Sequence, residues 1–391
     1  MEIPRLEDRA QDFTADPVEL FFDLAYVFAF SQLVGFLINE PSWGGVGKAA
    51  LLFGLLWLPW QQLTWAANTV EGFRRKIRLI LLVATVLSVP MAASTSTALD
   101  AGGLVFALSL GGIMLLGFLM QTLDSPQGTE LWDAIVWWIA PNLVAIVVLI
   151  AGALAEGPLR IGLWLVNLAI VLGAMIAAGR GEWLIRVGHM AERHGLIVII
   201  ALGEVIVAIG IPVVTALQDG DGLPGATTAA LVASGAFAGL LWWGYFDRPG
   251  PNLEERGTEL ASNRERGRYA RDVYTWAHAP IVAGIMLAAA ALEAISLHPL
   301  ERVAPSFRLM LVFGLVLFLG GIAIAVWRAF RTLAAERVVG AAAVAGVMLL
   351  GATLNGVTLL TLVVAVLLGS LIVEHYRFDR TGSHVEASPE V

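Results

Sequence analysis

The sequence of 391 residues contains no cysteine and few charged side chains. The absence of cysteine excludes disulfide bonds, thiolate metal sites and cysteine nucleophiles. The six histidines are scattered along the chain, so we predict neither a metal site nor a bound cofactor. A net charge of −8 provides no positive field for a phosphate backbone, which argues against nucleic-acid binding. Charged residues make up 14% of the chain, against about 25% in soluble domains, so the composition is not that of a soluble protein.

Hydrophobic residues make up 58% of the sequence, and its mean hydropathy is +0.78. The hydrocarbon core of a bilayer is about 30 Å thick, and a helix of about 20 apolar residues crosses it. Twelve apolar runs have a suitable length, at 18–37, 46–66, 77–97, 102–122, 132–153, 160–178, 195–215, 226–246, 270–292, 306–327, 335–351 and 354–374. The last two are separated near Gly351 because the whole uncharged stretch is too long for one span. The sequence therefore predicts an all-α polytopic membrane protein with about twelve transmembrane helices.

Lysine and arginine are distributed unevenly between the two sides of this predicted bundle. With the N-terminus inside, all but four of the 24 basic residues fall in cytoplasmic segments. The four exceptions are Lys48, Arg160, Arg302 and Arg308. Because positive residues are retained on the cytoplasmic side, both termini are predicted to be cytoplasmic. Residues 1–17 are acidic and precede a run long enough to span, so we expect no cleavable signal peptide.

Short similarities relate the first six predicted helices to the last six. The motif Gly-Leu-Leu-Trp occurs at 54–57 and 239–242, and Leu-Ser-Leu-Gly-Gly-Ile at 108–113 resembles Leu-Phe-Leu-Gly-Gly-Ile at 317–322. Halves of six helices each would have the same orientation and be related by an axis along the membrane normal, giving two parallel repeats. The predicted organisation is a cytoplasmic N-terminal segment (1–17), a first repeat (18–178), a cytoplasmic linker (179–194), a second repeat (195–374) and a cytoplasmic tail (375–391).

Three carboxylates within predicted spans are candidate functional residues. Glu19 and Asp23 are four residues apart in the first span, so they share one helix face, and Glu204 lies near the middle of the seventh span. Ionisable residues within a membrane typically mark ion paths, proton relays or binding sites, so we select all three as candidate ligands. The alternative for the first two is capping of the helix start. The alternative for Glu204 is an acid that is hydrogen-bonded or protonated for helix packing.

His278 lies in the ninth predicted span, two residues before Pro280. A proline within a helix removes the donor for the carbonyl four residues earlier, here that of Trp276. The imidazole could carry protons, pair with Glu204, or only bond this free carbonyl.

Aromatic and polar residues gather at the ends of the second and eighth predicted helices. Gln62 lies in the second helix, and Trp243, Tyr245 and Asp247 lie at the end of the eighth. We include all four as candidate ion, proton or substrate ligands. Trp and Tyr also form belts at bilayer interfaces, so a purely positional role is the alternative.

Other features are interpreted as structural. The basic segment 248–271 is predicted to be a solvated helix that could contact anionic headgroups. His189 and His194 are assigned to the cytoplasmic linker because five residues is a poor spacing for one helical face. The glycine pairs at 111–112 and 320–321 indicate close helix packing.

Two segments carry a resemblance to a known family. Pro-Val-Glu-Leu-Phe-Phe-Asp-Leu-Ala-Tyr-Val-Phe-Ala-Phe at 17–30 resembles the opening of the bacterial low temperature requirement A family, and Arg-His-Gly-Leu-Ile-Val-Ile-Ile-Ala-Leu-Gly-Glu at 193–204 is similar to its second signature. His278 with Pro280, and Trp-Trp-Gly-Tyr-Phe-Asp at 242–247, also fit this family. The resemblance implies a multi-pass protein of the bacterial inner membrane and brings no settled activity with it.

The leading functional hypothesis is transport of a small solute or ion between the two repeats, with proton or cation coupling as one form of it. Asp23 and Glu204 would bind a cation or exchange protons, and His278 would relay or balance charge. A membrane enzyme or lipid-handling protein with Glu204 and His278 as an acid/base pair is the alternative. A non-transporting envelope scaffold or sensor is a second alternative. The expected partners are the bilayer and the solute or cation; substrate, direction, channel or carrier mechanism and a homodimeric state stay open.

Overall fold

The computed structural model describes residues 15–70, 75–123, 130–178, 183, 185–218 and 222–385. Within these ranges the regular elements are helices, and one isolated bridge joins Arg302 to Asn355. The predicted N-terminal segment lies outside the described residues up to position 14, and the predicted tail does so from position 386.

The first half of the chain forms α1 (Pro17–Asn39), α2 (Trp43–Thr69), α3 (Arg75–Ser94), the short η2 (Thr95–Thr97), α4 (Gly103–Leu123), α5 (Glu130–Leu154) and α6 (Gly157–Ala178). The second half forms α7 (Val187–Gln218), α8 (Gly225–Phe246), α9 (Pro249–Thr258), α10 (Asn263–Ala270), the π-helical η3 (Arg271–Ala277), α11 (His278–Leu297), α12 (Pro305–Phe330), α13 (Ala335–Leu350) and α14 (Gly356–Val385).

The helices α10, η3 and α11 follow one another without a break, as one continuous stretch at Asn263–Leu297. Counted as one, and with the short α9 set aside, they bring the long helices of the described residues to twelve, close to the predicted spans. Ten helical stretches are long and apolar enough to cross a membrane. The prediction of an all-α, polytopic membrane protein is therefore confirmed.

The two long helices outside that set, α2 and α13, fall short for different reasons. The helix α13 has only 16 residues. In α2 the apolar character is diluted by a row of polar residues that are buried inside the bundle: Gln61, Gln62, Thr64 and Asn68. These side chains face other helices instead of lipid, which is the arrangement expected of polar groups at membrane depth.

The start of α7 corrects the sequence prediction. The helix begins at Val187, eight residues before the predicted span at 195, so His189 and His194 belong to a helix and not to a linker. The cluster of charges before Gly195 suggested a solvated loop. In the structure Arg193 and both histidines are at most 1% exposed, because they face carboxylates and amides of α1 and α2.

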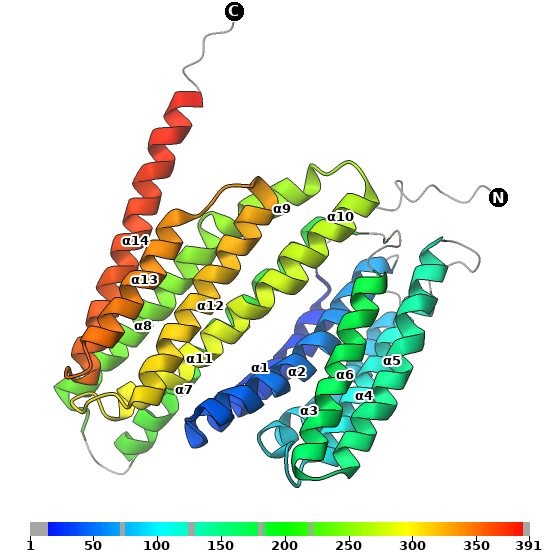
Figure 1. Cartoon of the computed structure of the whole chain (residues 1–391), viewed down its shortest axis with the longest axis horizontal. Coiled ribbons are helices and arrows are strands. Elements are labelled where there is room, and N and C mark those ends of the chain that lie inside the picture. Colours follow the sequence, from blue (N-terminus) through cyan, green and yellow to red (C-terminus); the bar gives the residue numbers. More distant parts are fainter. Residues whose placement is uncertain are drawn as a thin grey trace, which may run out of the picture.

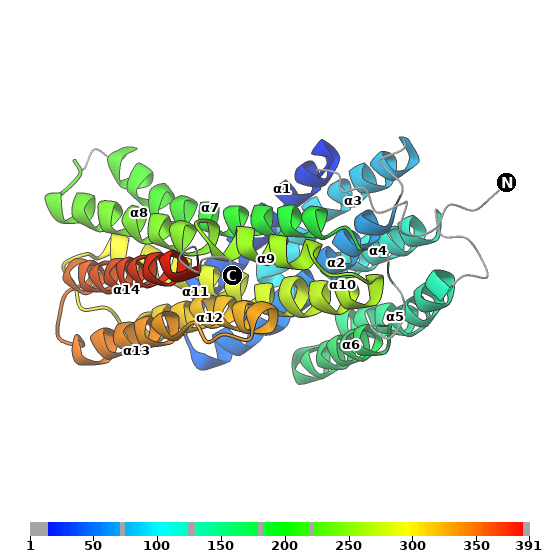
Figure 2. The same ribbon diagram turned by 90° about the horizontal axis from the view of Figure 1, so that it is seen from above.

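The two halves form neighbouring groups of helices (Figures 1 and 2). In the first half, α1 packs on α2 and α3, α4 packs on α2, α3 and α5, and α6 packs on α5 and α2. In the second half, α7 packs on α8 and α11, α12 packs on α11 and α13, and α14 packs on α13 and α8. The halves meet where α1 and α2 contact α7 and α11, near the centre of Figure 1.

Small residues permit the closest helix contacts. A Cβ atom added at Gly284 of α11 would lie 2.4 Å from the carbonyl oxygen of Gly314 on α12. The predicted close packing is found at Gly321, whose added Cβ would lie 2.7 Å from the Ala277 carbonyl oxygen, but the adjacent Gly320 has open space around it. Apolar side chains such as that of Val86, which is 68% exposed, cover the outer surface.

Candidate functional site

The carboxylate of Glu19 is held at the start of α1 by three groups. Asp16 and Glu19 form a capping box, in which the Asp16 backbone N–H donates to Glu19 Oε2 at 3.0 Å. His189 Nε2 contacts the same oxygen at 3.0 Å, and Arg193 Nη1 donates to Oε1. Glu19 is completely buried. Both of its oxygens are hydrogen-bonded, by the backbone at the start of α1 and by side chains of α7.

Asp23, one turn further along α1, is bonded through only one of its oxygens. Trp60 Nε1 donates to Asp23 Oδ1 at 2.8 Å, and Arg193 Nη2 donates to the same atom at 2.7 Å. The other oxygen, Oδ2, is buried and has no hydrogen-bond partner. The guanidinium of Arg193 also lies over the Trp60 ring, 5.7 Å from its centroid. Asp23 thus keeps one carboxylate oxygen open in a closed interior.

A side-chain amide determines which ring nitrogen of His189 is the hydrogen-bond donor. The Asn68 Oδ1 atom accepts from the Arg186 backbone N–H at 2.8 Å, and Asn68 Nδ2 donates to the Arg186 carbonyl oxygen at 2.8 Å, so the orientation of this amide is set. Asn68 Nδ2 also contacts His189 Nδ1 at 3.2 Å. Because Nδ2 is a donor, His189 Nδ1 must accept, and the proton on Nε2 is the one directed at Glu19.

By themselves, Glu19, Asp23 and Arg193 carry one more negative charge than positive charge. Glu19 and Asp23 are two carboxylates that share a single guanidinium, Arg193, and the three side chains are at most 1% exposed. The nearby guanidinium of Arg186 donates to the backbone carbonyls of Asn68 and Val70. An uncompensated charge in a buried site is costly, so such a site favours uptake of a proton or a cation.

A second set of contacts surrounds His194. Its Nδ1 contacts the Met190 carbonyl oxygen at 2.7 Å, which requires a proton on Nδ1. Its Nε2 therefore accepts from Gln61 Nε2 at 2.8 Å. The chain of donors continues, since Thr275 Oγ1 donates to Gln61 Oε1 at 3.0 Å and Trp65 Nε1 donates to Thr275 Oγ1 at 3.0 Å. Every bond in this series has a defined direction.

His278 has the same tautomer, fixed by the π-helical turn that precedes it. Its Nδ1 contacts the Val273 carbonyl oxygen at 2.8 Å, and its Nε2 is therefore the acceptor of the Tyr245 hydroxyl at 2.7 Å. The interpretation that His278 would satisfy the Trp276 carbonyl needs correction, because the wider π turn presents Val273 instead. Such π turns occur frequently at functional sites.

Ring contacts join these sets into one buried polar cluster. The Trp60 ring lies 5.2 Å from that of His194, and the His194 ring lies 5.1 Å from that of His278, measured between centroids. The members of the buried polar cluster are Glu19, Asp23, Trp60, Gln61, Asn68, His189, Arg193, His194, Tyr245, Thr275 and His278. They come from α1, α2, α7, α8 and the η3–α11 region, so the cluster lies where the two halves meet.

Glu204 lies apart from this cluster. Its carboxylate accepts from the hydroxyl of Ser31 on α1 at 2.5 Å, and the residue is 2% exposed. Ser31 is eight residues beyond Asp23, about 12 Å along the helix. The three predicted residues therefore do not converge on one point: Asp23 and His278 belong to the cluster, and Glu204 forms a second buried site on the same helix. The predicted pairing of Glu204 with His278 is not found.

The remaining predicted residues divide in the same way. Tyr245 belongs to the cluster. The Gln62 amide instead donates to the Met114 carbonyl oxygen at 3.0 Å, next to a different cavity. Trp243 is 51% exposed, and Asp247 lies at the surface, 3.6 Å from Arg248. Among the residues that the structure describes, no three histidine or carboxylate side chains are placed to hold a metal ion.

Sequence reasoning missed three central members, His189, Arg193 and His194. The signal was present in the spacing, because His189 and Arg193 are four residues apart, as Glu19 and Asp23 are. Two such pairs on facing helices meet in the structure. The charged character of the segment favoured a loop and concealed this match.

Comparison with known proteins agrees with this picture of a single membrane-embedded unit. An uncharacterised protein of Rhizobium meliloti (strain 1021) is 29% identical over 316 residues, which cover 78% of this chain and 75% of that protein. No solved structure matches the chain. The sequence profile described as bacterial low temperature requirement A protein (LtrA) matches residues 14–372, which include both the buried polar cluster and Glu204. The chain therefore belongs to the bacterial low temperature requirement A (LtrA) family.

Proposed function

We propose that this protein transports a small solute or ion across the bacterial inner membrane, with both termini in the cytoplasm, and that transport is coupled to a proton or another cation. One observation carries the proposal: a sealed cluster between the two halves holds two carboxylates against one guanidinium, with Asp23 Oδ2 open. A coupled transporter requires a buried group that becomes neutral when it takes up one positive charge and becomes charged again when it releases it.

Asp23 is the residue that would take up this proton or cation. Its Oδ1 is occupied by Trp60 and Arg193, so a proton or a cation would bind at Oδ2. The hydroxyl of Tyr26, one turn further on α1, is also buried without a hydrogen-bond partner in the part of the chain that the structure describes. Loading neutralises the cluster, and unloading restores its charge. A change of this size in a low-dielectric site favours different packings of α1 against α7 in the two states.

Glu204 with Ser31 provides a second polar station on the same helix. Between the two stations lie aromatic rings of α1 and α2, with Tyr26 and Phe30 in contact at 6.3 Å and Phe30 and Phe53 at 6.5 Å between centroids. We infer that this layer separates access from the two membrane faces, and that its rearrangement passes the ion between Asp23 and Glu204.

The contact pattern supports an arrangement of two six-helix repeats. If α7, α8, α11, α12, α13 and α14 correspond to α1 through α6, the neighbours α1–α2, α1–α3, α3–α4, α4–α5, α5–α6 and α2–α6 each have a counterpart in the second half. The contact of α2 with α4 has no counterpart of similar extent between α8 and α12 in the described residues. A path between parallel repeats follows from this arrangement.

The test uses proteoliposomes that contain a trapped pH-sensitive dye. A pH step is imposed in sodium or in potassium buffer, each with equal potassium on both sides and valinomycin to dissipate charge. The step is repeated with a low-molecular-mass filtrate of bacterial lysate to supply organic solutes. The wild-type protein is expected to move protons under at least one condition, and Asp23→Asn and Glu204→Gln should reduce this movement to the level of empty liposomes.

Glu259→Gln is the matched control, since Glu259 is an exposed carboxylate paired with Arg256 outside both stations. It should keep the wild-type rate. The proposal fails if wild-type protein moves neither protons nor radiolabelled sodium or rubidium ions under any condition, or if Asp23→Asn and Glu204→Gln keep both the rate and its pH dependence.

A non-transporting sensor or scaffold is the second candidate, favoured by the sealing of the cluster. Asp23, Glu204 and His278 are each at most 2% exposed. The liposome experiment separates the two, because a sensor gives no protein-dependent flux. The enzyme alternative loses its acid/base pair, since His278 is bonded to Tyr245 and Val273 while Glu204 is bonded to Ser31.

A further inference from the structure

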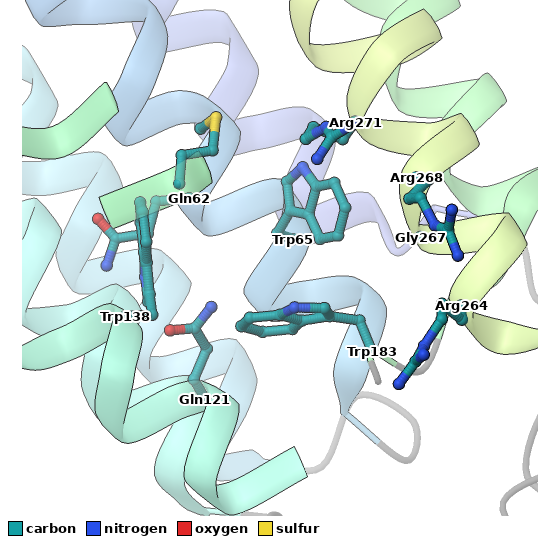
Figure 3. Close-up of a pocket in the computed structure, with 10 residues that line it drawn as sticks. Gln62, Trp65, Gln121, Trp138, Trp183, Arg264, Gly267, Arg268 and Arg271 are labelled. Carbon is teal, nitrogen blue, oxygen red and sulfur yellow. The ribbon is translucent and has the colours of Figure 1, made fainter. Parts of the chain in front are cut away.

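A cavity outside the buried polar cluster, and adjacent to it through the bond of Trp65 to Thr275, lies where α2, α4, α5 and α6 of the first half face α10 and η3 of the second (Figure 3). Its cavity volume is about 50 Å³, and it is open at its mouth. Its walls come from both halves: Gln62, Gln121 and Trp138 lie on one side, and α10 and η3 on the other (Figure 3).

Three arginines of one helical face border the cavity: Arg264, Arg268 and Arg271. They follow the spacing i, i+4 and i+7, so their side chains project from the same side of the rod. Arg264 and Arg268 are exposed and make no hydrogen bond or ion pair within the described residues, whereas Arg271 is paired with Asp272 at 2.7 Å. The described residues that line the cavity include no carboxylate. The mouth is therefore strongly positive.

The interior of the cavity is aromatic and includes buried polar atoms. Trp65 and Trp183 form an edge-to-face pair with centroids 6.0 Å apart. Trp138 is 6% exposed and Gln62 is 3% exposed, yet Trp138 Nε1 and Gln62 Oε1 are buried without any partner. The first is a donor and the second an acceptor. A hydroxyl group can accept from one and donate to the other, so it would satisfy both.

The location of the cavity restricts its occupant. The helix α10 lies at the same end of the bundle as the C-terminal end of α14, the end to which most arginines were assigned from the sequence (Figure 1). Tryptophans of this kind are typical of the level of lipid headgroups. Several guanidinium groups in a row favour a phosphate, which accepts forked pairs of N–H bonds.

We propose that this cavity binds a glycerol phosphate group, with the phosphate at Arg264 and Arg268 and a glycerol hydroxyl at Trp138 and Gln62. Two sources have this chemistry: the headgroup of phosphatidylglycerol in the membrane, and soluble glycerol 3-phosphate. The site does not depend on the transport proposed above, because it shares no residue with the buried polar cluster or with Glu204.

The test measures lipid binding to the full-length protein by native mass spectrometry after delipidation in dodecyl maltoside. Dioleoyl phosphatidylglycerol and dioleoyl phosphatidylcholine are added at equal concentration. The wild-type protein should retain phosphatidylglycerol in preference by roughly 25-fold, because each of the two arginines near an anionic headgroup contributes on the order of a fivefold gain. The double variant Arg264→Gln/Arg268→Gln, which alters only exposed side chains, should bring the ratio close to one.

The matched control is Arg75→Gln/Lys76→Gln, which removes two exposed charges from the start of α3 and should keep the preference. Trp138→Phe keeps an aromatic ring but removes the indole N–H, and should weaken phosphatidylglycerol binding several-fold while phosphatidylcholine binding stays unchanged. That difference separates loss of a ligand contact from a general loosening of the fold.

A second arm adds glycerol 3-phosphate in competition. If it displaces phosphatidylglycerol, and binds with the same dependence on Arg264 and Arg268, the site takes the soluble ester; if it does not, the site takes the membrane lipid. Both results support the assignment of the site to a glycerol phosphate group. The proposal is overturned if the wild-type protein neither prefers phosphatidylglycerol nor binds glycerol 3-phosphate, or if the Arg75→Gln/Lys76→Gln control loses the preference to the same extent.

Discussion

Two carboxylates on one face of α1 should lose different amounts of stability on the same chemical change. Glu19→Gln and Asp23→Asn each replace one carboxylate oxygen with an amide NH2 group, and each removes one negative charge from the buried polar cluster. The effect on net charge is therefore common to both substitutions. The difference between them depends on hydrogen bonds alone, which the structure specifies atom by atom.

Asp23→Asn can keep its contacts. Trp60 and Arg193 both donate to Oδ1, and the new amide nitrogen would replace Oδ2, which has no donor facing it. Glu19→Gln cannot, because Arg193 donates to Oε1 while His189 and the Asp16 N–H lie on Oε2. Either orientation of the amide places a donor against a donor.

The magnitudes follow from these contacts. A bond to a charged donor contributes about 1.5 to 3 kcal/mol, and an unsatisfied buried donor costs about 1 to 3 kcal/mol. Glu19→Gln should therefore be about 3 kcal/mol less stable than Asp23→Asn, which should itself stay within about 1 kcal/mol of the wild-type protein. The free energy of unfolding is measured by titration with sodium dodecyl sulfate in dodecyl maltoside micelles, followed by circular dichroism. Equal stabilities, or a larger loss in Asp23→Asn, would refute the contact assignment.

Three further substitutions test other parts of the structure. Gly321→Ala should lower the melting temperature in detergent, because its Cβ would lie 2.7 Å from a backbone oxygen, whereas the adjacent Gly320→Ala has open space and should leave it unchanged or higher; an equal response at both positions would contradict the packing of α11 on α12. Tyr245→Phe leaves the buried Nε2 of His278 without its donor and should cost about 1 to 3 kcal/mol of unfolding free energy, checked by the same titration; an unchanged value would contradict this bond. Asp247→Asn alters a surface carboxylate and should leave both stability and liposome flux unchanged; loss of flux would return this residue to the functional site.

The positions of the helices could be predicted from the sequence because the bilayer imposes a length and a composition on each span. The separation of α13 from α14 near Gly351 was predicted from the length of the uncharged stretch and from the Gly and Asn residues that favour a turn there, and the two helices are found to end at Leu350 and begin at Gly356. The start of α7 was wrong by eight residues, since hydropathy counts a charge as exposed wherever it occurs. Whether a charge is buried depends on its partner, and the partner of Arg193 is over 170 residues away in the sequence.

The site was predictable as far as single residues and no further. Asp23, Glu19, His278 and Tyr245 are recognisable because an ionisable or hydroxyl group in an apolar run requires a reason. Their grouping is a property of the fold, so the sequence could not reveal that Asp23 joins His278 through two aromatic rings while Glu204 stays apart.

The polar face of α2 has a consequence for how the chain is made. Gln61 is bonded to His194 and Thr275, and Asn68 to Arg186, all of which are synthesised more than a hundred residues later. When α2 leaves the ribosome, none of these partners exists yet, and the helix is too polar to settle in lipid on its own. Biogenesis must therefore retain α2 at the insertion machinery, or shield it, until α7 and η3 have been translated.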